Sequence, residues 1–177
     1  MKNIAYTLMF FFVVHARAEP NSESLQHYAE QFNKHALMEY DYQFHLSKIN
    51  YAAIINILVD INKLKQPLKF DIHGHTGSFC RLDGDVQLPT DFKPEQAADL
   101  VCGASLEYQI AIGHTYAQLM ADMVKSLVPK AQVDVVSYGS EVPRAAYPTL
   151  KPKNSEELKA WNQIAAQNNR VELVIVP

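Results

Sequence analysis

Two histidines separated by one residue, His73 and His75, are the side chains in this chain whose spacing offers chemistry. On a strand, residues two apart face the same side, so both imidazoles can bind one Zn²⁺ ion if a third ligand such as His45 or His114 joins them. Local spacing does not fix that third ligand. Ser78 lies near His75 in the sequence but lacks the pattern of a nucleophile elbow. The residues therefore predict no metal site, no cofactor and no enzymatic activity.

The two histidines belong to a stretch that predicts a strand followed by a turn. Leu68, Phe70 and Ile72 alternate with polar residues, which is the period of a half-buried strand. The strand leads directly into the turn Gly74-His75-Thr76-Gly77.

The rest of the chain supplies the elements that would position this turn. Apolar periodicity predicts strands over 40–46, 131–138 and 171–176, and helices over 54–64, 106–128 and 154–165. A further short amphipathic helix is expected around 25–32. The resulting order is β-α-β-α-β-α-β, so we expect an α/β sandwich in which helices cover one face of a four-stranded sheet.

The N-terminal residues 1–18 have the pattern of a secretory signal peptide. Lys2 precedes an apolar run, and Ala16-Arg17-Ala18 offers a cleavage site near Ala18. Removing this segment changes the formal net charge from −3 to −5, because it carries two basic residues and no acidic one. Weak acidity argues against a nucleic-acid partner, and no later segment is long and apolar enough to span a membrane.

Cys80 and Cys102 are the only cysteines. In an exported chain, such a pair predicts a disulfide. Both cysteines lie in the stretch 78–103, which is rich in Gly, Pro and Asp and is expected to be a loop that the disulfide staples.

Three motifs, in order, resemble the OmpA-like C-terminal domain family, which includes OmpA, Pal and MotB. The motifs are Ile72-x-Gly74-His75-Thr76, then Ser137-Tyr138-Gly139 with Pro143, and then Asn169-Arg170-Val171-Glu172. The resemblance implies an OmpA-like domain over 39–177 with an insertion at 78–103, preceded by an N-terminal extension at 19–38.

The resemblance also implies a ligand pocket, whose charged residues this chain lacks. Members of the family bind the diaminopimelate of peptidoglycan with an Asp after Gly-His-Thr and an Arg in the second helix, which suit an ammonium and a carboxylate. Here the Asp position is Gly77, the Arg position is Tyr116, and a neighbouring Asn position is Gln109. The pocket positions implied by the resemblance are Gly74, His75, Thr76, Gly77, Gln109, Tyr116 and Arg170.

Two interpretations follow from these substitutions. In the first, the pocket is lost and the domain serves as a periplasmic, outer-membrane-associated structural subunit that binds other subunits of an envelope complex, such as a secretion core resembling the Dot/Icm type. In the second, the chain is a peptidoglycan-binding anchor with a rebuilt pocket, in which Asp83 or Asp85 replaces the acid and Arg81 or Arg170 replaces the base. We favour the first and expect weak or absent peptidoglycan binding. At least one of the two additions, residues 19–37 and 78–103, is then expected to form the main contact with a neighbouring subunit.

Overall fold

The computed structural model describes residues 22–36, 39–40, 46–48, 50–64, 68–83 and 94–176. The expected signal segment, His45 and Asp85 lie outside the described residues.

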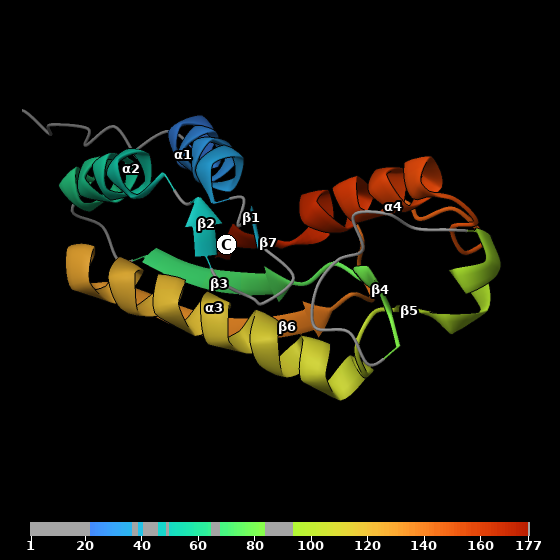
Figure 1. Cartoon of the computed structure of the whole chain (residues 1–177). Coiled ribbons are helices and arrows are strands. Elements are labelled where there is room, and N and C mark those ends of the chain that lie inside the picture. Colours follow the sequence, from blue (N-terminus) through green and yellow to red (C-terminus); the bar gives the residue numbers. More distant parts are fainter. Residues whose placement is uncertain are drawn as a thin grey trace, which may run out of the picture.

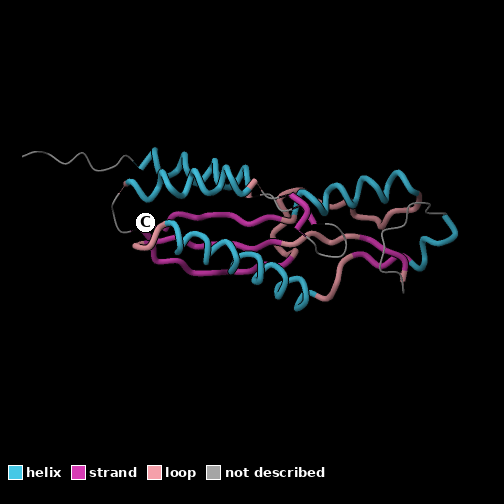
Figure 2. The backbone as a smooth tube through the Cα atoms, turned by 60° about the vertical axis from the view of Figure 1, so that its left-hand side comes forward, coloured by secondary structure: helices cyan, strands magenta, loops and turns pink. Residues whose placement is uncertain are grey.

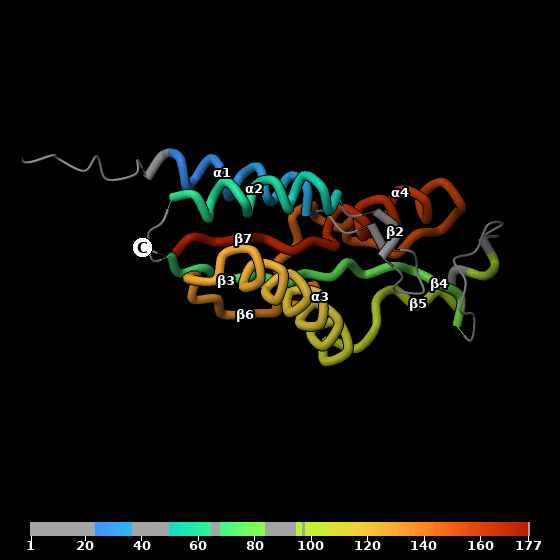
Figure 3. Tube along the Cα trace, turned by 90° about the vertical axis from the view of Figure 1, so that its left-hand side faces the viewer, coloured from blue at the N-terminus to red at the C-terminus, as the bar shows by residue number. Residues whose placement is uncertain are grey.

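The central sheet consists of three strands in the order β6-β3-β7 (Figures 1 and 3). Strand β3 (Leu68–His75) runs parallel to β6 (Ala131–Gly139) and antiparallel to β7 (Arg170–Val176). The predicted alternation along β3 is confirmed, since Leu68, Phe70 and Ile72 are buried. Their polar neighbours therefore lie on the opposite face of the sheet.

Three helices cover the apolar face: α1 (Ser22–His35), α2 (Tyr51–Lys63) and α3 (Leu106–Leu127). Their buried side chains join those of the strands in one core, which includes Phe32, Leu58, Phe70, Met120 and Leu173. The expected α/β class is thus confirmed, and α1 to α3 lie on one side of the sheet. No helix in the described part of the chain is long and apolar enough to cross a membrane.

Helix α1, which lies within the expected N-terminal extension 19–38, is part of the folded core. Phe32 and Ala36 are fully buried. The Asn33 side chain accepts a hydrogen bond from the Leu173 backbone N–H at 2.7 Å, and the Ala36 carbonyl accepts one from Val171 at 3.5 Å. The end of α1 therefore covers the outer edge of β7, which would otherwise expose unpaired backbone groups. The apolar side of α1 is consequently used within the chain rather than left for a neighbouring subunit.

The expected first strand at 40–46 is not a member of the central sheet in the described residues. Strand β1 (Glu39–Tyr40) instead pairs antiparallel with β2 (Leu46–Lys48), and the residues between them lie outside the description. The described central sheet has the three strands β6, β3 and β7, and residues 41–45 of the expected fourth strand lie outside the described residues.

The described parts of the stretch 78–103, namely 78–83 and 94–103, contain two short strands and a 3₁₀ helix where the composition predicts a loop. Strand β4 (Cys80–Leu82) pairs antiparallel with β5 (Leu100–Cys102), and the 3₁₀ helix η1 (Pro94–Asp99) precedes β5. Cys80 and Cys102 face each other in this pairing and form the predicted disulfide.

This hairpin packs on the last helix, α4 (Ser155–Asn168), at the opposite end of the molecule from the start of α1 (Figure 2). Buried Cys80, Leu100, Leu158 and Trp161 form a second, smaller core. A capping box begins α4: the Asn154 side chain accepts from the Glu157 N–H at 2.9 Å, and Glu157 accepts in return from the Lys153 N–H and the Asn154 amide.

Candidate functional site

The first glycine of the turn allows α3 to approach β3 closely. A Cβ atom at Gly74 would lie 2.1 Å from the Gly113 carbonyl oxygen of α3. Next to this crossing, the Ser137 hydroxyl donates a 2.7 Å hydrogen bond to the Ile110 carbonyl. Gly74 therefore serves the packing of helix on sheet, and it leaves no cavity at this point.

The second glycine, Gly77, is the residue at which the resemblance implies an acid in the family, and α4 fills the space around it. A Cβ atom at Gly77 would lie 1.9 Å from the Ala165 carbonyl oxygen and 2.8 Å from the Ala165 Cα. The Gly77 N–H donates to the side chain of Asn169, and Thr76 N–H donates to the Gly139 carbonyl at 2.8 Å. No side chain, and hence no carboxylate, fits at position 77 in this arrangement.

The two expected pocket residues of α3 lie on the helix side of the sheet. Gln109 is 5% exposed, and its amide donates to the Ala104 carbonyl at 3.1 Å and to the Ser78 hydroxyl at 3.4 Å. Tyr116 is partly buried and packs against the main core. Both side chains are thus used in packing.

Arg170 lies on the other face of the sheet and is engaged through three nitrogens. Its Nε donates to Glu172 Oε1 at 2.6 Å, Nη1 donates to the Asn168 carbonyl at 3.3 Å, and Nη2 donates to the Val142 carbonyl at 3.1 Å. Arg170 is 5% exposed. The guanidinium is therefore already occupied by hydrogen bonds within the chain at the start of β7.

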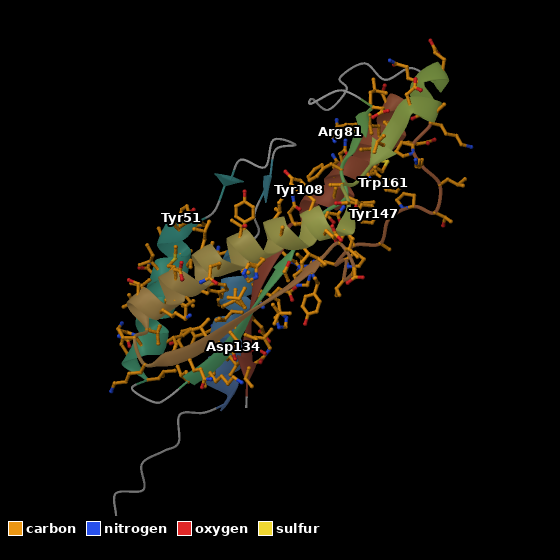
Figure 4. The ribbon with its side chains drawn as sticks, turned by 90° about the horizontal axis from the view of Figure 1, so that it is seen from below. Tyr51, Arg81, Tyr108, Asp134, Tyr147 and Trp161 are labelled. Atoms are coloured by element: carbon orange, nitrogen blue, oxygen red, sulfur yellow. A yellow bond between two sulfur atoms is a disulfide. The ribbon has the colours of Figure 1, made fainter. Side chains whose placement is uncertain are left out.

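The other expected substitutes lie on the β4–β5 hairpin. Arg81 is exposed there (Figure 4). Asp83 is exposed as well, and its N–H donates to the Asp99 carbonyl at 2.8 Å. Arg170 is not on this hairpin, because it lies at the start of β7 in the central sheet. The expected pocket positions and the described substitutes are therefore divided among the two faces of the sheet and the hairpin.

A hollow of about 310 Å³ lies beside α4, away from the expected pocket residues. Its lining includes Pro148, Leu150, Lys151, Ala160 and Trp161. None of the pocket positions implied by the resemblance lines it.

Polar and aromatic side chains gather on the face of the sheet that α1 to α3 leave open. His73 and His75 come from β3, Tyr138 from the end of β6, and Arg170 and Glu172 from the start of β7. The Tyr138 ring stacks on His75 with centroids 5.3 Å apart, and it meets the edge of His73 at 5.2 Å. His75 Nε2 lies 3.5 Å from Glu172 Oε2. We call these five residues the open-face cluster.

The charges in the open-face cluster are strongly coupled. His75 and then Arg170, which both contact the carboxylate, lower the pKa of Glu172 to about 2. Burial, followed by the nearby His75, lowers the pKa of His73. At neutral pH, Glu172 is therefore ionised and His73 is neutral. A carboxylate and a neutral imidazole side by side can accept a proton or bind a cation.

Of the two residues considered as a third ligand for His73 and His75, the structure describes only His114, and His114 is not near them. His114 is exposed on α3, the helix that covers the opposite face of the sheet. Glu172 instead lies beside them, because β7 pairs antiparallel with β3 and places Glu172 opposite His73. The sequence carried only an indirect signal for this residue, namely its place in the Asn-Arg-Val-Glu motif at the start of the last strand.

Comparison with known proteins gives a likeness in structure but not in sequence. No protein-family model matches the chain, and no curated protein gives a significant sequence match. Among solved structures, the chain is similar to the periplasmic domain of Helicobacter pylori MotB (residues 90–256), with 16% identity and a TM-score of 0.41. The match covers 80% of this chain and 68% of that one.

Proposed function

We propose that this protein is a non-catalytic, OmpA-like structural domain of the periplasm that has lost the charged grip on diaminopimelate. The three motifs of the resemblance support the OmpA-like assignment, because they meet at one place in the fold. Tyr138 of the second motif stacks on His75 of the first, and Glu172 of the third lies 3.5 Å from the same imidazole. Three motifs far apart in sequence thus form one cluster at the ends of adjacent strands.

The contact between Gly77 and α4 is the main observation that supports the loss of the charged grip on diaminopimelate. The Ala165 backbone occupies the position that a side chain at residue 77 would need. An acid at this turn would have to displace α4 together with the hydrogen bond from the Trp161 indole to the Ser78 carbonyl, at 2.7 Å. The space for the ammonium partner is therefore filled by the protein itself.

The second half of the grip is also missing. Tyr116 offers one hydroxyl where the family has a guanidinium, and Arg170 is held by Glu172 and two carbonyls. A charge-assisted hydrogen bond contributes about 1.5–3 kcal/mol, so losing both grips weakens binding by about two or more orders of magnitude.

The cellular role that fits such a domain is assembly. The signal-like segment directs the chain to the periplasm, and a domain that keeps its fold without its ligand acts through protein contacts. We propose that it associates with the outer membrane as a subunit of an envelope complex, with a secretion core as the most specific form of this proposal. The insertion 78–103, which carries exposed Val101 and Arg81, is the remaining candidate for the subunit contact.

Co-sedimentation with purified peptidoglycan tests this proposal. The mature chain is expected to stay in the supernatant, while envelope fractionation recovers the native protein with its partner subunits. The opposite result would be that the unaltered chain pellets with peptidoglycan and that Asp83→Asn or Arg81→Gln abolishes this pelleting. That result would support the anchor with a rebuilt pocket. Lys130→Gln, which changes an exposed charge after α3, is the matched control for the effect of charge alone.

A further inference from the structure

His75 is a buried imidazole with no hydrogen-bond partner in the described part of the chain. Its exposed fraction is 2%, and neither Nδ1 nor Nε2 makes a hydrogen bond. A buried polar group without a partner is unfavourable, and such groups in native proteins call for an explanation such as a bound ion. The stacked Tyr138 ring covers one side of the imidazole and offers no ligand for its nitrogens in this arrangement.

Two further ligand groups converge on the same place. One ligand atom each from His73, His75 and Glu172 lies within 4.8 Å of the others. The closest pair, His75 Nε2 and Glu172 Oε2, is 3.5 Å apart. Ligand atoms of a tetrahedral Zn²⁺ site lie about 2.0–2.1 Å from the ion and hence about 3.4 Å from each other. This pair already has the spacing of two zinc ligands, and His73, which is only partly buried, can rotate to complete the set.

We propose that His73, His75 and Glu172 bind one Zn²⁺ ion on the open face of the sheet. Two imidazoles and one carboxylate suit Zn²⁺ and disfavour Mg²⁺ and Ca²⁺, which prefer oxygen ligands. The set supplies three protein ligands, so a water molecule or an outside ligand would have to complete a tetrahedral site. The proposal is independent of the structural role proposed above.

Arg170 orients the carboxylate without occupying the oxygen that the ion needs. Its Nε holds Glu172 Oε1, whereas Oε2 faces His75. Such an outer contact typically fixes a metal ligand in position. The positive charges on this face, Arg170 and Lys69, are balanced by Glu172, Asp71 and Asp134, and Lys69 lies 3.6 Å from Asp134. The local field therefore admits a divalent cation.

Zinc binding by the mature full chain, purified without a polyhistidine tag, tests the proposal. Isothermal titration with ZnSO₄, with MgCl₂ run separately, measures affinity and stoichiometry, and Co²⁺ absorption reports a four-coordinate site. His73→Ala removes a ligand that is only partly buried, and Glu172→Gln removes the carboxylate. His114→Ala is the matched control, because this exposed histidine lies on α3. Circular dichroism confirms that each variant is folded.

We expect one Zn²⁺ per chain, no saturable Mg²⁺ binding and a rise in the unfolding temperature with zinc. His73→Ala should weaken zinc binding at least about tenfold, while His114→Ala should bind like the unaltered chain. If Glu172→Gln proves unfolded, the comparison of His73→Ala with His114→Ala still tests the zinc site. The proposal is overturned if the unaltered chain shows no saturable zinc binding, or if folded His73→Ala binds zinc as tightly as the unaltered chain.

Discussion

Replacing Gly77 with alanine tests whether α4 fills the space beside Gly77, where the proposed loss of an acid is located. The new Cβ atom would lie 1.9 Å from the Ala165 carbonyl oxygen, whereas an ordinary contact begins at 3.4 Å, so α4 has to move by about 1.5 Å. The obstructing atoms belong to a helix backbone and cannot rotate away. Overpacking of this kind costs about 1–3 kcal/mol.

The same displacement strains the hydrogen bonds that fasten α4 to the turn and the hairpin. Trp161 Nε1 donates to the Ser78 carbonyl at 2.7 Å, and the Asn162 side chain accepts from Cys80 N–H at 2.9 Å. Each such bond contributes about 1 kcal/mol. We therefore expect Gly77→Ala to lower the free energy of unfolding by about 3 kcal/mol.

Urea unfolding, followed by the fluorescence of the single tryptophan and by circular dichroism, measures this loss. Trp161 is a local probe because it is buried and its ring centroid lies 4.9 Å from that of Tyr147. Leu119→Ala on the exposed side of α3 is the control and should change stability by less than about 0.5 kcal/mol.

The sign of the effect decides between a filled and an open turn. Gly77 does not adopt a positive φ, so alanine in open space would stabilise the chain by about 0.4–1 kcal/mol through the unfolded state. A neutral or stabilising Gly77→Ala would refute the claim that α4 closes the pocket.

Three further predictions concern the core, the disulfide and the pH dependence. Phe32→Ala should cost about 3–5 kcal/mol in urea unfolding because Phe32 is fully buried, whereas Tyr51→Ala at an exposed site should cost far less. Replacing both Cys80 and Cys102 with serine should cost about 3 kcal/mol, since the disulfide closes a loop with a sequence separation of 22; equal stability with and without reductant would contradict this. Folding lowers the pKa of Glu172 from 4.5 to about 2, so its stabilisation is complete above about pH 4.5 and is lost as the pH falls towards 2. The difference in unfolding free energy between the unaltered chain and Glu172→Gln should therefore shrink from pH 6 to pH 3, and a constant difference would count against the carboxylate.

Local patterns predicted most of the elements of this fold. The alternation of Leu68, Phe70 and Ile72 predicted β3, and the apolar periodicity over 154–165 predicted α4. The disulfide followed from the presence of only two cysteines and from the export signal. The strand and the helix could be predicted because they depend on neighbours in sequence.

The features that sequence analysis missed depend on long-range packing. Phe32 belongs to an N-terminal segment for which a contact with a neighbouring subunit was expected. Its side chain is instead buried within the chain, because α1 covers the edge of β7. Glu172 joined the histidines only through the antiparallel register of β7 with β3. The filled turn at Gly77 comes from a backbone contact with α4, 88 residues further along the chain. No periodicity in the sequence encodes such contacts.

Titration of a soluble, diaminopimelate-containing stem peptide into the purified mature chain tests the central claim most directly. We predict no saturable heat at peptide concentrations up to about 1 mM, because Gly77 has no room for an acid and Arg170 is already engaged. One-site binding with a dissociation constant in the micromolar range would contradict the account and restore the peptidoglycan anchor as the function of this protein.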